Sequence, residues 1–469
     1  MKSVHLFLTS CLLLLSFKSA LADQGKLLVT NEPSLWARNK LITSAVAGQE
    51  IEVEYYEADQ DAFMLGILGL LQQAAQRGIT VHLLIDNLHN HITAPQMAAM
   101  MQTPGFEIRV FNPVKNLDVF EQTYRNHDKM MNLDGQQMII GGRNLSVDYF
   151  QTAGAVNYRD IDLFVQGPSA MDAKNYFLEL WNNNPMVQAP FLNAYSQDSL
   201  TQDCDALAVS SVCERQVGQA QQDIADAQAQ ISDAAKNILA PSPGDTIDLQ
   251  QKLINFDAKF VFDDPDKTVA NIQDRFENQF IQLATQTVSG STSASLTVIT
   301  PYLYPTPEEM AMLQSLADQG VHLKFITNSI QSTDEMLAQV AYASIKPNLI
   351  AMGADIFEYT GPEILHAKVA VFNENSSAPS FVIGSFNFDN RSAYINREIG
   401  IYISGQDTTV ITSNLQNAIT GILQNAVQTG GDHAEVNANK MDQLTDPAKT
   451  AQFENSKTLF TLHFVRKQI

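Results

Sequence analysis

Two segments of the sequence place a lysine two residues after a histidine and reach an asparagine further along. An apolar run precedes the asparagine in both segments, followed by Gly-Gly-Arg in the first and Gly-Ser-Phe in the second. Residues two apart on a strand point to the same face of a sheet, so each histidine should project together with its lysine. Such a pair presents a nucleophile or acid, and a fixed positive charge, to one anion. The six residues are His127, Lys129 and Asn144 in the first segment, and His366, Lys368 and Asn387 in the second.

Both segments are parts of a longer internal repeat. Four blocks occur in the same order in each half of the chain, which chance similarity would rarely produce. Strand-like runs alternate with amphipathic helical runs, a pattern that predicts an α/β protein with a parallel or mixed sheet flanked by helices. We therefore expect two pseudo-repeated halves that face one another, with one active site at their interface. The matched blocks are 51–58 and 296–304, 77–87 and 319–329, 127–144 and 366–387, and 158–167 and 396–405.

The composition of the 469-residue chain is that of a globular protein long enough for two domains. Acidic residues outnumber basic ones, and the formal net charge is -22. A surface of this charge repels nucleic acid and anionic membranes at long range, so a polyanionic partner would need a local basic site. We therefore expect no nucleic-acid partner.

The N-terminus has the features of an export signal. Lys2 precedes an apolar run, and Ala20, Leu21 and Ala22 give the small-x-small pattern of a signal-peptidase site. We expect cleavage near Ala22 and an exported protein, either periplasmic or secreted. In an oxidising compartment, the two cysteines that remain should form one disulfide closing a small loop. They are Cys204 and Cys213.

Composition and the repeat divide the chain into five segments. An Ala-, Gln- and Asp-rich stretch separates the halves, has the composition of a solvated helix, and ends at a Pro-Ser-Pro-Gly breaker. We interpret this stretch as an insertion or linker. The expected segments are a signal peptide (1–22), a first half (23–200), the insert and linker (201–262), a second half (263–430) and a C-terminal extension (431–469).

With both copies in view, the sequence resembles the phospholipase D superfamily, and within it the bacterial two-motif members of the cardiolipin synthase type. The resemblance extends over residues 34–425 apart from the insert. A single His-x-Lys is weak evidence, whereas two copies, each followed by an apolar strand, Gly-x-x-Asn and an acidic residue, are highly specific. The residues that carry the resemblance are the two His-Lys pairs, Asp134, the GGRN motif at 141–144, the GSFN motif at 384–387 and the run at 391–400.

The resemblance implies phosphodiester chemistry that requires no cofactor. One neutral imidazole would attack phosphorus and form a phosphohistidine, while the other imidazole, protonated, would protonate the departing alcohol. By analogy with the family, His127 is the nucleophile and His366 the general acid, although the roles could be exchanged. Lys129 and Lys368 would bracket the non-bridging oxygens, and the two asparagine amides would donate hydrogen bonds to them.

Each histidine also needs an acceptor that fixes its tautomer, as in a Ser-His-Asp triad. Asp160 lies 33 residues after His127, and Glu398 lies 32 residues after His366. We therefore predict that Asp160 orients His127 and that Glu398 orients His366, with Asp162 as the alternative in the first half. The motif glycines would allow a tight turn and close backbone approach. The expected supporting residues are Asp134, Asp160, Glu398, Gly141, Gly142, Gly384 and Ser385.

The second motif departs from the family pattern at one position. Asn373 stands where an aspartate is expected, at the place that Asp134 takes in the first motif. An amide can accept some of the same hydrogen bonds as a carboxylate but cannot pair a charge. We expect activity to be retained, with a degenerate second half as the alternative.

Three functions fit these observations. The leading hypothesis is phosphatidyl transfer on glycerophospholipids at a membrane surface, either to water, giving phosphatidic acid, or to an alcohol. The second is a nuclease-type phosphodiesterase, but nucleases of the superfamily are typically short single-motif chains with basic surfaces. The third is a catalytically degenerate binding or effector protein, which only Asn373 supports. Because one chain carries both motifs, no oligomer is required.

Overall fold

The computed structural model describes most of the chain between Ala22 and Phe460. The described residues are 22–113, 123–150, 157–204, 210–238, 249, 252–267, 275–288, 294–405, 409–431 and 446–460. The predicted signal peptide, apart from Ala22, lies outside the described residues. Within these ranges, no helix combines the length and the apolar character needed to span a bilayer.

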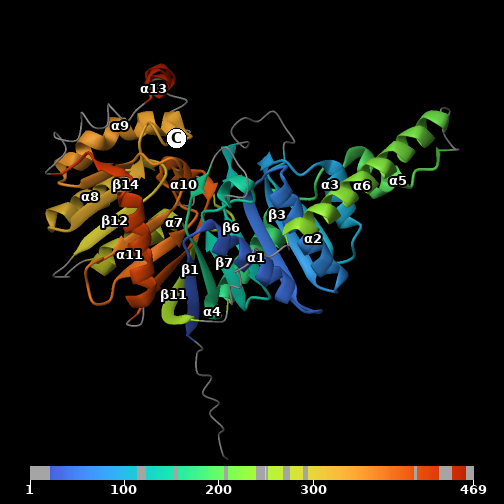
Figure 1. The fold of residues 1–469 in the computed structure, drawn as a ribbon, viewed down its shortest axis with the longest axis horizontal. Coiled ribbons are helices and arrows are strands. Elements are labelled where there is room, and N and C mark those ends of the chain that lie inside the picture. Colours follow the sequence, from blue (N-terminus) through green and yellow to red (C-terminus); the bar gives the residue numbers. More distant parts are fainter. Residues whose placement is uncertain are drawn as a thin grey trace, which may run out of the picture.

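One sixteen-stranded sheet runs through both halves of the molecule (Figure 1). The strand order of the second half mirrors that of the first, and the two orders meet at an antiparallel pair, β1 with β11. From its outer edge, the first half contributes β10 (Val187–Gln188), β4 (Phe106–Phe111), β3 (Thr80–Asn90), β2 (Glu50–Ala58), β6 (Lys129–Leu133), β7 (Gln137–Gly141), β9 (Asp162–Gln166) and β1 (Asp23–Leu28). From the centre outward, the second half contributes β11 (Ile254–Phe262), β21 (Ile399–Ser404), β18 (Ser380–Gly384), β17 (Val369–Phe372), β12 (Ser295–Ile299), β14 (His322–Asn328), β15 (Asp355–Tyr359) and β22 (Ala426–Gln428).

Each half is a mixed sheet, as the sequence predicts. β2, β3 and β4 are parallel to one another, and so are β12, β14 and β15. Parallel neighbours need crossover connections, which are α2 (Ala62–Gln76) and α3 (Ala94–Met101) in the first half and α8 (Pro307–Asp318) and α9 (Met336–Ala351) in the second. The other strands of both halves pair antiparallel. The predicted α/β architecture of two repeated halves is therefore confirmed.

The equivalent crossover helices α2 and α8 carry similar start and stop signals. The Asp61 side chain caps the first turn of α2, and Thr306 and Glu309 form a capping box at the start of α8. Each helix is followed closely by a glycine with positive φ, 90° at Gly78 and 80° at Gly320. This left-handed backbone ends the helix and turns the chain into the next strand.

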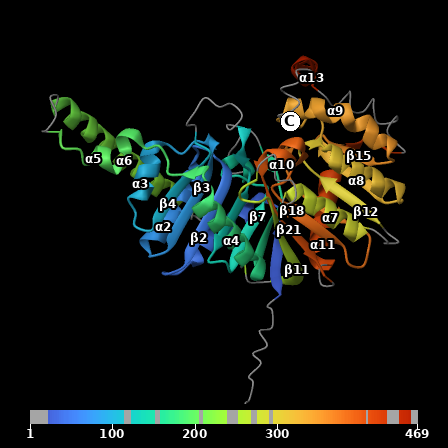
Figure 2. The same ribbon diagram turned by 180° about the vertical axis from the view of Figure 1, so that it is seen from behind.

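Helices cover both faces of the sheet. In Figure 1, α1 (Asn31–Ser44) and α2 lie in front of the first half, while α11 (Thr409–Leu423) lies in front of the second. Figure 2 shows α4 (Pro168–Asn183) and α7 (Phe276–Val288) on the opposite side. α4 and α11 follow the equivalent strands β9 and β21, so equivalent helices lie on opposite faces. The two motif histidines lie just before the equivalent strands β6 and β17.

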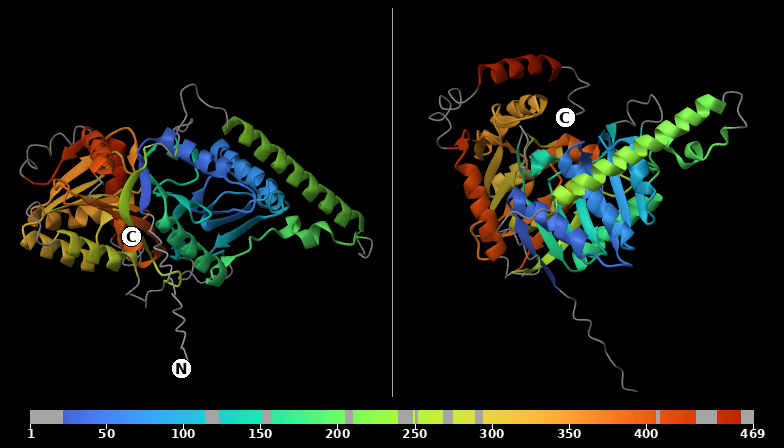
Figure 3. Two further views of the ribbon diagram at one scale, coloured as in Figure 1. Left: turned by 90° about the horizontal axis from the view of Figure 1, so that it is seen from below. Right: turned by 45° about the vertical axis from the view of Figure 1, so that its right-hand side comes forward.

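The predicted insert forms a helix that packs on the first half. α6 (Ser210–Ile238) runs along α2 and α3 and extends beyond the sheet (Figure 3). Its buried stripe of Ala220, Ile224, Ala227 and Ile231 faces the body of the first half. A Cβ on Gly69 of α2 would lie 2.7 Å from the Ile231 carbonyl oxygen, so this glycine permits the close approach. The helix is therefore only partly solvated, contrary to the prediction.

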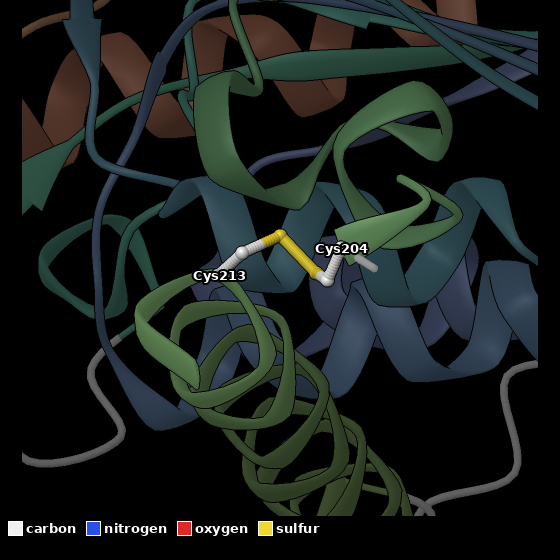
Figure 4. The surroundings of a disulfide bond; sticks show 2 residues. All are labelled: Cys204 and Cys213. Carbon is white, nitrogen blue, oxygen red and sulfur yellow. A yellow bond between two sulfur atoms is a disulfide. The ribbon is translucent and has the colours of Figure 1, made fainter. Parts of the chain in front are cut away.

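The predicted disulfide between Cys204 and Cys213 is present, with Cα atoms 5.5 Å apart (Figure 4). It ties the first turn of α6 to the residues that follow α5 (Gln197–Leu200). The predicted range 201–262 also contains β11, which is a strand of the main sheet, so its last residues belong to the sheet rather than to a linker. In the C-terminal extension, α13 (Pro447–Phe460) packs Phe453 against α9.

Candidate active site

Two short parallel strand pairs link the halves and position both motif histidines. Each pair joins the residues just before a histidine to the residues just before the acidic residue of the other half. The backbone N–H of His127 donates to the Arg397 carbonyl (3.1 Å), and that of His366 donates to the Arg159 carbonyl (2.9 Å). The pairs are β5 (Arg125–Asn126) with β20 (Asn396–Arg397), and β16 (Ile364–Leu365) with β8 (Tyr158–Arg159).

Because of these strand pairs, the histidine of each half is oriented by a carboxylate from the other half. Nδ1 of His127 lies 2.9 Å from Oε2 of Glu398, and Nδ1 of His366 lies 2.7 Å from Oδ2 of Asp160. The prediction that each carboxylate orients the histidine of its own half is therefore wrong. The physical reason is the parallel pairing, because it places the residue after β20 beside the residue after β5. In both histidines Nδ1 faces the carboxylate, so Nε2 is the nitrogen left for chemistry.

Asp162, the alternative orienter, has a different role. Its Oδ2 lies 3.0 Å from Arg38 Nη1 and 3.2 Å from Arg143 Nη1, and it also accepts from the Ser34 hydroxyl. Asp162, Arg38, Arg143 and Ser34 are all almost completely buried. This ion-pair network fixes the arginine of the GGRN motif behind the site.

The surroundings of the two carboxylates differ between the halves. Ser385 and Ser392 donate hydroxyl hydrogen bonds to Glu398 at 2.5 and 2.6 Å. Gly142 takes the place of Ser385 in the first half, and a Cβ there would lie 2.5 Å from both oxygens of Asp160. The shorter aspartate thus packs against a bare backbone, whereas the longer glutamate is held by hydroxyls. Ser385 and Gly142, both predicted to support the site, therefore each contact one of the orienting carboxylates.

Both motif lysines lie beside the histidine of their own half. Lys129 Nζ donates to the His127 carbonyl and Lys368 Nζ to the His366 carbonyl, both at 2.6 Å. Lys368 Nζ also lies 3.0 Å from Nε2 of His366. Burial lowers the pKa of Lys129 to about 7 and that of Lys368 to about 8, although the charges of Glu398 and Asp160 oppose the shift. The lysines are thus placed to gain charge as an anionic phosphoryl group enters.

Both histidines are buried: 7% of the surface of His127 and 5% of that of His366 is exposed. Charges of the second motif also act on the histidine of the first. Burial lowers the pKa of His127 well below its usual value, and the charges of Lys129, Lys368 and His366 lower it further. Burial also lowers the pKa of His366, to about 4, with Lys368 adding to the effect and Asp160 opposing it. An imidazole that is neutral at neutral pH can attack phosphorus.

The motif asparagines lie at the same site. Nδ2 of Asn144 donates to Glu57 Oε2 (2.8 Å) and to the Tyr149 hydroxyl (2.9 Å), and the backbone N–H of Asn387 donates to the Ser392 hydroxyl (3.2 Å). Their Oδ1 atoms are buried without a partner. Hydrogen bonds from these amides to a phosphate stay a prediction. The sequence did not point to Glu57, whose only signal was its place two residues after Tyr55 on a strand that pairs with the first motif.

Aromatic rings surround both histidines. Tyr56 packs edge-on against His127, with centroids 4.9 Å apart. Tyr149 and Tyr158 stack on one another at 4.4 Å, and both meet the ring of His366 edge-on at 5.2 and 5.1 Å. Such contacts restrict the rotation of the imidazoles and exclude water from one side of each ring. Tyr149 and Tyr158, too, were not predicted to belong to the site.

Asp134 and Asn373 are equivalent turn residues rather than contacts of the histidines. Both have left-handed backbones, with φ of 56° and 53°, at the turns that follow β6 and β17. Asparagine and aspartate adopt this conformation more readily than most residues. Nδ2 of Asn373 donates to the Thr287 carbonyl (2.8 Å), and Asp134 lies 3.5 Å from the ammonium of Lys174. The Asn373 departure therefore lies in the scaffold, where the amide makes a bond that a carboxylate cannot make.

A protein-family model described as "Cardiolipin synthase, PLD-like domain" matches residues 40–181 and 287–419, which together exceed half of the chain. The chain belongs to this family, which confirms its resemblance to the phospholipase D superfamily. The two matched segments correspond to the two halves of the sheet. With both motifs complete in histidine, lysine and asparagine, the chain has the residues of an enzyme of that superfamily.

Individual relatives are distant but cover most of the chain. An uncharacterised protein of Helicobacter pylori is 25% identical over 381 residues, covering 75% of this chain and 71% of the relative. Cardiolipin synthase C of Escherichia coli is 24% identical over 390 residues, covering 77% of each. The crystal structure of a phosphatidylserine synthase from Haemophilus influenzae has a TM-score of 0.59 at 12% identity, covering 94% of this chain and 97% of that protein. This last similarity shows a common fold.

Proposed function

We propose that this protein is a phosphatidyltransferase of the cardiolipin synthase type, acting on glycerophospholipids through a phosphohistidine intermediate. The observation that carries the proposal is the pair of buried histidines, each held at Nδ1 by a carboxylate from the other half and each followed by a buried lysine. Membership of the cardiolipin synthase family and the similarity to cardiolipin synthase C support the same substrate class.

In the first step, Nε2 of neutral His127 attacks phosphorus while its Nδ1–H donates to Glu398. The bond from phosphorus to the head-group oxygen breaks, and protonated His366 gives its Nε2 proton to that oxygen. The products are a phosphatidyl-histidine, a free head-group alcohol and a neutral His366. The ammonium groups of Lys129 and Lys368 stabilise the extra negative charge on the non-bridging oxygens in the transition state.

In the second step, an alcohol or water enters where the head group left. Neutral His366 removes its proton, the oxygen attacks phosphorus, and the bond from phosphorus to Nε2 of His127 breaks. Attack by water gives phosphatidic acid, and attack by an alcohol, such as the hydroxyl of another phospholipid, gives a new phosphodiester. Both outcomes return the two histidines to their starting protonation states, and microscopic reversibility makes the same residue acid and base.

The charge distribution supports His127 as the nucleophile. Burial, and after it the positive charges of Lys129, Lys368 and Arg391, lower the pKa of His127 and keep its ring neutral. Burial and the charge of Lys368 lower the pKa of His366 to about 4. Asp160 and Asp334 oppose this lowering, and the negative charge of a bound phosphodiester favours the protonated ring further. A neutral ring is required of a nucleophile, and a protonated ring is required of an acid.

The proposal is tested by incubating the purified protein with mixed vesicles of phosphatidylglycerol, phosphatidylethanolamine and phosphatidylcholine, with and without added glycerol. We expect release of a head group together with phosphatidic acid or a new phosphodiester. Rapid acid quenching should trap a phosphatidyl adduct on His127, detectable by mass spectrometry and lost in His127→Ala. Cleavage of DNA with every phospholipid left intact would instead favour the nuclease.

Two features oppose the other candidate functions. The net charge of -22 disfavours approach of a nucleic acid. The role of Asn373 in a turn removes the argument for a degenerate site, since the second motif retains its histidine, lysine and asparagine.

Export to a compartment with membrane surfaces is the second part of the proposal. The leader sequence before Asp23 and the disulfide between Cys204 and Cys213 support it. Mass spectrometry of the mature N-terminus and fractionation of expressing cells test it. A protein that keeps residues 1–22 and stays inside the cell would contradict export.

A further inference from the structure

The charged groups around the two histidines are not the same. Beside His127, the charges of Asp86, Arg391 and Arg125 act on Tyr56, whose pKa burial raises. Beside His366, the charged neighbours of the tyrosines are carboxylates. Burial raises the pKa of Tyr158, and the negative charges of Asp334, Glu57 and Asp148 raise it further. Asp334 therefore adds a negative charge beside His366, next to tyrosine rings that contact the imidazole.

Three tyrosines and one aspartate lie together on this side of the site. The Tyr158 hydroxyl donates to Oδ2 of Asp334 (3.1 Å), and the Tyr302 hydroxyl lies 3.0 and 3.1 Å from its two oxygens. The stacked rings of Tyr149 and Tyr158 stand between this carboxylate and His366. Asp334 is exposed to solvent, whereas Tyr158 and Tyr302 are half-buried. We call these four residues, Tyr149, Tyr158, Tyr302 and Asp334, the tyrosine–aspartate cluster.

The carboxylate of Asp334 is held in position by hydrogen bonds from uncharged groups, and its charge also acts on Lys368 and His366. Its hydrogen-bond partners in the described part of the chain are tyrosine hydroxyls, which donate protons but carry no positive charge. The loop that carries it is braced by a hydrogen bond from the Thr333 N–H to the Ser329 carbonyl (3.1 Å), and α13 adds one from Lys449 Nζ to the Thr333 carbonyl (2.9 Å). A fixed, exposed carboxylate beside tyrosine rings attracts cations, through its charge and through the ring faces.

We propose that the tyrosine–aspartate cluster binds the ammonium group of an amine-bearing head group, such as ethanolamine or choline, while its oxygen is bonded to phosphorus. This inference rests on the proposed function and names the substrate class of the same site. The geometry places the cluster next to His366, the residue that protonates the departing head-group oxygen. A head group bridging from His366 to Asp334 would leave along this side, and an amino alcohol would enter from it in the reverse reaction.

The competing explanation is that the cluster only ties the halves together, since Tyr158 belongs to the first half and Asp334 to the second. A tie would affect every substrate equally, whereas an ammonium subsite affects only substrates that carry a positive charge. Substrate ratios therefore separate the two explanations, and overall activity does not.

The experiment measures head-group release from vesicles in which phosphatidylethanolamine, phosphatidylcholine or phosphatidylglycerol is diluted to the same surface fraction. For Asp334→Asn, we expect kcat/KM for the two amine lipids to fall at least about tenfold relative to phosphatidylglycerol, the size of one lost charge-assisted interaction. Tyr158→Leu should reduce phosphatidylcholine turnover most, because a quaternary ammonium cannot donate hydrogen bonds and depends on ring faces. Free choline and ethanolamine should compete with the lipids in the wild type and less in Asp334→Asn, which tests the ammonium apart from the lipid.

A matched control exists on the α6 arm, by which we mean α6 and residues 193–204 before it: the Tyr195 hydroxyl donates to Oδ2 of Asp223 (3.0 Å). Asp223→Asn removes the negative charge from the same kind of bond, far along the chain from both motifs, and should leave the ratios unchanged. Equal losses on all three lipids, or no change in the ratios, in an Asp334→Asn protein with wild-type melting behaviour would overturn the subsite alone. A wild type that releases no head group from any lipid would overturn the proposed function, and this inference with it.

Discussion

Oε2 of Glu398, in the second half, lies 2.9 Å from Nδ1 of His127, in the first half, and Asp160 of the first half holds His366 of the second in the same way. Each half therefore lacks the carboxylate that its own histidine needs. The exchange couples the chemistry to the docking of the halves, because separating them would release both imidazoles together.

Because Glu398 orients His127 and Asp160 orients His366, variants of the two carboxylates should slow different steps: formation of the phosphohistidine and its breakdown. With bis(p-nitrophenyl) phosphate, whose leaving group needs no acid, Glu398→Gln should slow formation of the adduct on His127 by about 10²–10⁴-fold. Asp160→Asn should let the adduct form and accumulate, because His366 is then a poor base for its breakdown. Rapid-quench mass spectrometry of the adduct measures both steps. The reverse assignment, with slow formation in Asp160→Asn, would contradict the exchange.

Asn373 supports the fold rather than the reaction. Asn373→Asp replaces the donor that binds the Thr287 carbonyl (2.8 Å), so we expect the free energy of unfolding to fall by about 1–3 kcal/mol. Turnover per folded molecule should change little. The matched variant Asp134→Asn keeps a residue suited to φ of 56° and should be close to neutral. Denaturant unfolding and head-group release measure the two quantities, and a large rise in turnover for Asn373→Asp would contradict a scaffold role.

The repeated architecture could be predicted from the sequence, because strands such as β6 and β17 have recognisable residue patterns. Each is a buried strand that follows a motif histidine and ends at a left-handed turn, so apolar runs and turn residues reveal it. The carboxylate exchange could not be read in this way. It depends on β5 and β20, which are two residues long, polar and without periodicity. Spacings of 33 and 32 residues are equally compatible with pairing within a half and pairing between halves.

The α6 interpretation failed for a different reason. Its acidic and amide-rich composition suggested a solvated helix, but buried Ala220, Ile224, Ala227 and Ile231 recur at intervals of three and four residues. That spacing forms one narrow stripe on a helix. Composition averages over all faces of a helix, whereas packing depends on one face. The tyrosine–aspartate cluster was equally hidden, since Tyr158 and Asp334 meet only after the halves dock.

The disulfide stabilises the end of the α6 arm rather than the site. Cys204 and Cys213 close a nine-residue separation at the start of α6, away from both motifs in the fold (Figure 1). Replacing both by serine should raise hydrogen exchange in the first turns of α6 and leave head-group release unchanged. Loss of a closed loop of this size corresponds to about 2–3 kcal/mol in the chain-entropy model, acting on the arm. A parallel loss of activity would show that the arm takes part in catalysis.

The buried lysines predict that anion binding takes up protons. At pH 8, Lys129, with its pKa lowered to about 7, is mostly neutral, and Lys368, lowered to about 8, is half charged. A bound dianion favours both ammonium forms, so sulfate, which does not titrate in this range, should bind with uptake of about one proton or more. Its affinity should fall as the pH rises from 7 to 9.

Calorimetry of sulfate binding in buffers of different ionisation enthalpy measures this uptake. Lys368→Met should reduce both the uptake and the affinity, whereas substitution of the exposed Lys236, at the end of α6, should change neither. Without an anion, both lysines bind fewer protons in the folded than in the unfolded state between their lowered pKa values and about 10.5, so their contribution makes stability rise with pH across that window. Sulfate binding whose enthalpy is the same in every buffer would show that the lysines are already charged, and would remove the proposed gain of charge on substrate entry.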